Sequence, residues 1–244
     1  MSVSPTALHP KNMSSKRSKR YEKAAALVEE GKHYSLEDAV ALLKTFPAPK
    51  FDATVTLSAH LGVDPRKSDQ MVRGSVALPH GTGKQIKVIV FASGDAAKAA
   101  EEAGADEVGF EDLIKKVQGG YTDFDAAIAT PDAMTEVRKI ARVLGPRGLM
   151  PNPKTGTVTD DTAAAVNAVK AGRIDYKVDK SGNIAAACGK ASFSESQLLE
   201  NASAFLDSIV KAKPASAKGN YIQSFTLAAS MLPGVPLDIS SYNA

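Results

Sequence analysis

The sequence has little cysteine, no tryptophan and no long apolar run, and these shortages exclude whole classes of protein. The single cysteine, Cys188, cannot form an intramolecular disulfide, so the chain is not a disulfide-stapled secreted scaffold. An inert, partly buried thiol is its expected state. The apolar run 86–91 is interrupted by Lys87 and is far below the roughly 20 residues of a membrane-spanning helix. With no secretory leader pattern either, no membrane partner is expected.

Catalytic signatures are also missing. The four histidines are scattered, and there is no HExxH, paired CxxC or GxSxG. Residues 81–84 (GTGK) look like a phosphate loop, but Gln85 and an apolar strand follow where a P-loop has Ser or Thr and a helix. A turn or hinge is the better interpretation. The sequence predicts no catalytic residue and no cofactor.

Two acidic pairs could suggest a metal site: Asp123 with Asp125, and Asp160 with Asp161. Acids of turns and helix N-termini are much commoner, and no histidine accompanies these pairs. We therefore expect no metal.

The chain does have a basic N-terminal segment, although its formal net charge is only +3. The segment contains only one acidic residue, Glu22, and six basic residues: Lys11, Lys16, Arg17, Lys19, Arg20 and Lys23. The segment reads as a solvated tail or as an arm that touches phosphate. A mitochondrial targeting segment is disfavoured by two prolines and by the lack of an amphipathic period. Residues 1–13 are expected to be a flexible extension.

The first and last parts of the chain carry antiparallel α+β patterns. Helices are predicted over 21–30 and from Ser35 to Pro47, then an alternating strand over 51–60 and a short strand over 72–78. Strands follow over 174–178 and 184–187, joined by a hairpin turn at 179–183. A capping box, Ser194 with Gln197, opens a helix, and a final strand covers 221–228.

The middle of the chain alternates strand and helix instead. Strands are predicted over 86–91, 108–110 and 126–129, with a helix after each; Asp95 caps the first and Pro131–Asp132 open the third. A further helix ends at Gly172. The predicted fold class is therefore α/β and α+β in two domains. Residues 1–80 and 173–244 would form a split antiparallel domain, with a parallel α/β domain, 81–172, inserted.

One segment is not explained by secondary structure. Glycines and prolines make 144–154 (LGPRGLMPNPK) a stiff loop, from which Arg147 and Lys154 project positive charge. The two residues are candidates for phosphate contacts. A helix stop with incidental charges is the alternative.

This loop resembles the signature of the family of bacterial large-ribosomal-subunit protein one (L-one), the protein of the mobile ribosomal stalk at the tRNA exit site. Other stretches match in family order: 50–52, 61–70, 72–74, 78–84, 189–193 and 218–219. The resemblance spans about residue 14 to the end. It implies a split, ferredoxin-like α+β domain with an inserted Rossmann-like domain, which agrees with the patterning.

The resemblance also implies a function. The chain would be a structural constituent of the large ribosomal subunit and not an enzyme. It would bind large-subunit rRNA directly at the stalk, assist release of exit-site tRNA and repress its own operon by binding the mRNA. A monomer within the cytoplasmic ribosome is implied. A nucleotide- or sugar-phosphate-binding enzyme built on the α/β domain is the alternative, and an architectural component with no role on mRNA is a third hypothesis.

Individual RNA contacts follow from the resemblance position by position. Lys50, Phe51 and Thr54 match contacts on the first strand, where they would offer a charge, a flat ring and a hydroxyl. Taken alone, the alternation favours Phe51 as a core residue. Ser224 matches a further polar contact. Ser230, Met231 and Leu232 match a Thr-Met-Gly triad, with leucine in place of the glycine that would let backbone approach RNA.

Overall fold

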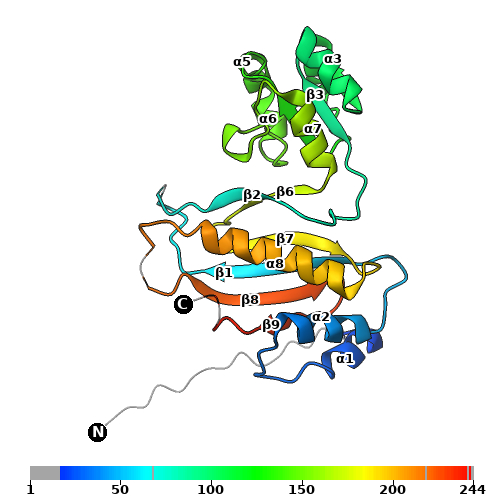
Figure 1. Ribbon diagram of the computed structural model, residues 1–244, viewed down its shortest axis with the longest axis vertical. Coiled ribbons are helices and arrows are strands. Elements are labelled where there is room, and N and C mark those ends of the chain that lie inside the picture. The colour runs from blue at the N-terminus through cyan, green and yellow to red at the C-terminus, as the bar shows by residue number, and fades with distance from the viewer. Residues whose placement is uncertain (1–16, 68, 218, 241, 243–244) are drawn as a thin grey trace.

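The computed structural model describes residues 17–67, 69–217, 219–240 and 242. The expected extension, 1–13, and the basic residues Lys11 and Lys16 lie outside the described residues. Figure 1 shows a four-stranded antiparallel sheet below, a two-stranded ribbon in the middle and a three-stranded parallel sheet above. Among the helices of the described part, none combines the length and apolar character that a membrane crossing requires.

The antiparallel sheet has the strand order β7-β1-β8-β9, from Asn183–Lys190, Thr54–Leu61, Ile222–Ala229 and Val235–Leu237. The predicted alternation is confirmed in β1, where Val55, Leu57 and Ala59 are buried and the polar residues between them are not. The strand begins at Thr54, however, so Phe51 lies outside it. Because β1 is central, its two ends fix the places where polar residues of neighbouring strands meet.

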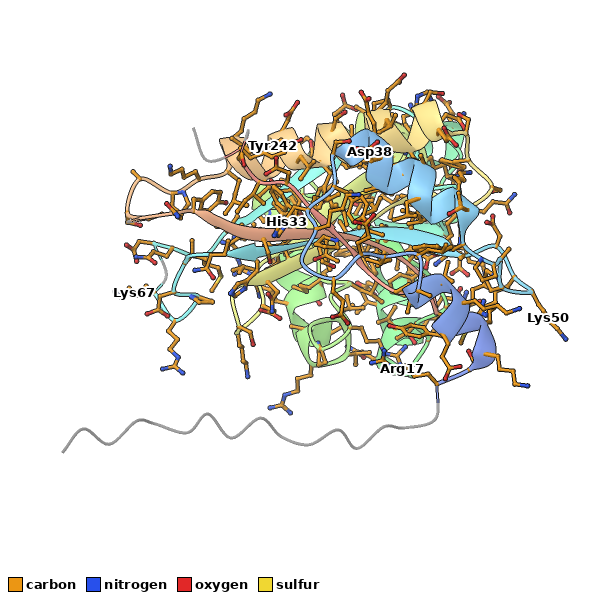
Figure 2. All side chains as sticks on the ribbon, turned by 90° about the horizontal axis from the view of Figure 1, so that it is seen from below. Arg17, His33, Asp38, Lys50, Lys67 and Tyr242 are labelled. Atoms are coloured by element: carbon orange, nitrogen blue, oxygen red, sulfur yellow. The ribbon has the colours of Figure 1, made fainter. Side chains whose placement is uncertain are left out.

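Helices α2 (Leu36–Thr45) and α8 (Glu195–Lys211) cover one face of this sheet, whereas α1 (Lys19–Ala25), which follows the labelled Arg17, lies toward its other side (Figure 2). The capping box of α8 is confirmed, since the Ser194 and Gln197 side chains each accept from the other residue's backbone. Ser35 caps α2 alone, by accepting from the Asp38 N–H. The apolar stripes of α2 and α8 pack on the inner residues of β1 and β8 in one core.

The ribbon corrects one prediction. Strands β2 (Arg73–Ala77) and β6 (Arg173–Lys177) pair with each other, whereas β7 pairs with β1. The turn at 179–183 does form, with the Asp179 N–H donating to the Asn183 carbonyl at 2.8 Å. Its two strands nevertheless enter different sheets, so the expected β6–β7 hairpin is wrong. Each of the two strands pairs with a strand that is distant in sequence and not with its neighbour.

The parallel sheet is confirmed, with order β4-β3-β5 from Glu107–Gly109, Val88–Phe91 and Ala126–Ala129. Residues of β3 alternate between two cores. Val88 and Val90 face α3 (Asp95–Glu102) and α7 (Thr162–Lys170). Ile89 and Phe91 face the opposite side, covered by α4 (Glu111–Gln118) and by the segments that follow β5. A continuous apolar strand buried on both faces is what such a layer requires.

Two helix predictions here need correction. The helix expected from Pro131 to Gly145 is broken into α5 (Met134–Val137), a 3-10 turn (Arg138–Ile140) and α6 (Ala141–Leu144). Asp95 is the first residue of α3 and does not cap it, because the N-cap is Gly94 at a φ of 66°. Periodicity identified the buried faces but could not show local winding.

The two chain crossings between the sheets touch each other at glycines. A Cβ on Gly172 would lie 2.2 Å from the Cα of Gly81, so the crossing at Gly172 tolerates no side chain. Asn201 of α8 is fully buried, and its side chain fixes the crossing at Gly81 through hydrogen bonds. It accepts from the His80 N–H at 3.0 Å and donates to the carbonyls of Gly81 and Cys188 at 2.9 and 2.8 Å. The 81–84 segment is therefore a pinned turn that leads into β3.

Candidate nucleic-acid interface

The predicted contacts Thr54, Ser230 and Met231 meet at one end of the antiparallel sheet. Thr54 begins β1, and Ser230 follows β8 directly. The Ser230 N–H donates to the Thr54 carbonyl at 3.0 Å, and its hydroxyl donates to the same oxygen at 3.4 Å. Residues 176 positions apart in sequence are thereby held side by side.

Lys50 and Phe51 form a bend in the connection that precedes this end of β1. Phe51 is 48% exposed, which overturns the core assignment that alternation alone favoured. Its neighbour Asp52 fixes the connection, because its two carboxylate oxygens accept from the N–H and hydroxyl of Ser192 at 3.1 and 2.8 Å. Figure 2 shows Lys50 projecting away from the body of the molecule. An exposed ring beside a free cation suits stacking on a base with a phosphate contact nearby.

The turn between β8 and β9 carries the remaining predicted residues. Met231 has a φ of 61°, a left-handed conformation that no other non-glycine residue of the described chain adopts, and it is 69% exposed. Leu232 donates its N–H to Ala229 and packs its side chain against the antiparallel core. The left-handed position is therefore Met231 and not the position at which leucine replaces the family glycine.

Ser224 does not join this group. It lies opposite His60 in the β1–β8 ladder, whereas Ala229 lies opposite Val55. At about 3.3 Å per residue, the register places Ser224 roughly 20 Å from the Thr54 end of the sheet. Its side chain is exposed, so it is free to touch a ligand that extends along the strand.

The two basic residues of the stiff loop lie beside the parallel sheet. Arg147 donates through Nη1 to the Thr122 hydroxyl. Lys154 is in a 3-10 turn, Pro153–Thr155, and its side chain lies outside the described residues. The loop is tied to the ribbon, because Arg173 donates to both the Thr155 carbonyl and the Ser75 hydroxyl. A cleft of about 440 Å³ separates loop residues 148–150 from Thr54 and Lys190.

Sequence reasoning missed two cations of the site. Arg20 of α1 donates through Nη2 to the Met231 carbonyl at 3.3 Å, and Lys190 of β7 donates to the Thr54 hydroxyl at 2.9 Å. Arg20 was visible only as one of the six basic residues of the N-terminal segment. Lys190 was visible within the 189–193 stretch, but nothing there indicated its partner.

A second basic surface lies on the ribbon. Arg73 stands directly opposite Lys177, an arrangement that costs free energy unless an anion is near. Arg66, Lys177 and Lys180 line a hollow of about 740 Å³ with Met71, which is 39% exposed. No acidic side chain of the described residues pairs with these cations. The nearby Asp179 is engaged by backbone N–H groups of Ser181 and Asn183, which lower its pKa.

The residues considered for other chemistry have structural roles. Asp123 and Asp125 pair with Lys87 and Lys84, and the side chain of Asp161 caps α7. Within the described ranges, no group of three or more histidine, cysteine or acidic residues could hold a metal. Burial raises the pKa of Cys188 to about 12, so its thiol is not a nucleophile near neutral pH.

Comparison with known proteins places the chain in a family. A sequence model of the Ribosomal protein L1p/L10e family matches residues 42–233. Large ribosomal subunit protein uL1 of Salinispora tropica is 58% identical over 221 residues, which are 91% of this chain and 93% of that protein. The proteins of the same name in Corynebacterium urealyticum and Rhodococcus erythropolis are 57% and 58% identical; they align with 92% and 91% of this chain and over 94% and 93% of their own length.

These relatives are named as ribosomal proteins and not as enzymes, which confirms that this chain is not an enzyme and removes the nucleotide- or sugar-phosphate enzyme alternative. The family found by comparison is also the one that the 144–154 signature indicated. The chain belongs to the ribosomal protein L1p/L10e family.

Proposed function

We propose that this protein is a constituent of the large ribosomal subunit and binds large-subunit rRNA directly at the mobile stalk. The observation that carries the proposal is the meeting of Thr54, Ser230 and Met231 at one end of β1, with Phe51 exposed beside them. Its relatives are named for the large subunit. The protein acts there as a monomer within the cytoplasmic ribosome.

The site reads RNA mainly through shape and sugar contacts. Phe51 stacks on a base or sugar, Lys50 binds a phosphate, and the hydroxyls of Thr54 and Ser230 bond to 2′-OH groups. Met231 adds apolar surface at the left-handed turn. Leu232 contributes its backbone position rather than its side chain, and Ser224 contacts a part of the RNA farther along the strand.

Two domains divide this work. Residues 1–80 and 173–244 form the split RNA-binding domain, and 81–172 form the inserted domain, with the crossings at Gly81 and Gly172 as the boundary. The separate hydrophobic cores of the antiparallel and parallel sheets support this division. Arg147 and Lys154 of the inserted domain add phosphate contacts across the cleft.

The basic ribbon surface takes the exit-site tRNA. Its cations have no acidic partners in the described chain, and a stalk that carries rRNA on one surface and tRNA on another can assist release by moving. The rRNA site also binds the mRNA of its own operon and represses translation when that mRNA mimics the stalk junction. One face cannot hold both RNAs at once, and this competition couples repression to ribosome assembly.

The test is a filter-binding titration of the whole chain against a stalk-junction transcript and an unrelated hairpin of equal length. We expect a strong preference for the junction. Because stacking on an aromatic ring contributes about 1–3 kcal/mol, Phe51→Ala should weaken junction binding by roughly 5- to 150-fold. Leu27→Ala is the matched control, since Leu27 is 46% exposed and outside the site. Equal, weak binding of both RNAs by the wild type would refute the function.

A further inference from the structure

A continuous chain of contacts links two cations through the proposed RNA site. Arg20 donates to the Met231 carbonyl, Ser230 donates to the Thr54 carbonyl, and Lys190 donates to the Thr54 hydroxyl. The residues that make these contacts belong to α1, the β8–β9 turn, β1 and β7. The cations therefore stand at the two ends of the group of residues that would contact RNA.

Arg20 is not fully satisfied in the free protein. Its Nη1 is buried without a hydrogen-bond partner, the only such side-chain nitrogen or oxygen found in the described residues. No described carboxylate lies within ion-pair distance of its guanidinium. A buried charged donor without an acceptor is unfavourable, and the 3.3 Å bond to Met231 compensates only in part. Such a donor indicates an acceptor that arrives from outside.

Lys190 is held in place by packing from the opposite side. A Cβ on Gly83, whose φ is 69°, would lie 2.9 Å from Cγ of Lys190, so the backbone of the turn 81–84 lies directly against the lysine stem. The ammonium donates to Thr54 and is likewise without a carboxylate partner among the described residues. Because Thr54 Oγ1 accepts this hydrogen bond, the threonine O–H remains available to donate a hydrogen bond to a ligand.

We propose that Arg20 and Lys190 contact the RNA backbone on either side of the Thr54–Ser230–Met231 group, and that each binds one phosphate. The proposal rests on the proposed function, because it extends the same site. A phosphate of the RNA supplies the acceptor that Nη1 of Arg20 lacks. Lys190 keeps two ammonium protons for a phosphate while its third holds Thr54.

The experiment measures binding of the stalk-junction transcript by the whole chain over a series of salt concentrations. Arg20→Gln and Lys190→Gln remove charge but keep an amide donor. Each should weaken binding and reduce the slope of log Kd against log salt by about 0.7–0.9, the effect of one phosphate, and the double variant should lose about twice that. Lys190→Arg keeps the charge and should keep the slope.

Lys23→Gln is the matched control, because Lys23 lies on the same helix as Arg20 and is exposed. A slope loss in Lys23→Gln equal to that in Arg20→Gln would overturn the proposal in favour of the general charge of α1. Weaker binding with an unchanged slope would also overturn it, since the cations would then act only by holding the turn and Thr54. A wild type without preference for the junction would instead be a failure of the proposed function. Circular dichroism of each free variant checks that it has folded.

Discussion

The buried amide of Asn201 offers the sharpest test of how the antiparallel layer holds the chain crossing. Replacement by leucine keeps the branched heavy-atom skeleton of asparagine and removes three hydrogen bonds, to the His80 N–H and to the carbonyls of Gly81 and Cys188. All three partners are backbone groups that the substitution leaves in place. The change therefore measures what it costs to leave them unpaired.

The expected loss can be worked out group by group. The Cys188 carbonyl is inside the core, and a buried acceptor without a partner costs about 2 kcal/mol. The His80 N–H and the Gly81 carbonyl lie nearer to solvent, where water can replace the lost partner, so the loss of each hydrogen bond costs about 1 kcal/mol. The free energy of unfolding should fall by about 4 kcal/mol, a large share of the 5–15 kcal/mol of a typical domain.

Urea unfolding followed by circular dichroism measures this loss from the midpoint and slope. Asn167→Leu is the control, since Asn167 is exposed on α7 and the same substitution there should change stability by no more than about 0.5 kcal/mol. A loss below about 1 kcal/mol in Asn201→Leu would refute the reasoning, because the crossing would then not depend on this side chain.

Two further predictions concern single residues. The thiol of Cys188 should not react with a thiol reagent at pH 8 in the folded protein, because burial raises its pKa to about 12, and should react on unfolding in urea; fast reaction of the native chain would contradict the buried thiol. Met231→Gly should raise the free energy of unfolding by up to about 1 kcal/mol, because glycine adopts a φ of 61° without strain, while weakening junction binding; a less stable variant would show that the turn is not strained.

Much of the local structure could be predicted because local chemistry decides it. The Ser194–Gln197 capping box and the buried alternation of β1 follow from residues that interact within a few positions of each other. The nearly continuous apolar run at 86–91 indicated a strand of a parallel sheet, and β3 is such a strand, buried along its whole length. The break of the helix expected over 131–145 was not visible, because periodicity records the buried side and not the winding.

The candidate site was only partly predictable. The resemblance identified Lys50, Phe51 and Thr54, but alternation by itself placed Phe51 in the core, and only the start of β1 at Thr54 leaves its ring exposed. Arg20 and Lys190 could not be paired with Met231 and Thr54 from sequence, because each pair is separated by more than 130 residues.

Periodicity, caps and short motifs are local properties, and they were enough to predict the types of element, the parallel or antiparallel character of each part, and the family. Which strands pair and which side chains meet depends on packing between distant segments, and could be read only from the folded chain. Strands β6 and β7, joined by a good turn, separate and pair with β2 and β1, so that each pairing completes a different sheet over one shared core. Met231 takes the left-handed position, and the next residue, Leu232, packs its side chain against the core of the antiparallel layer.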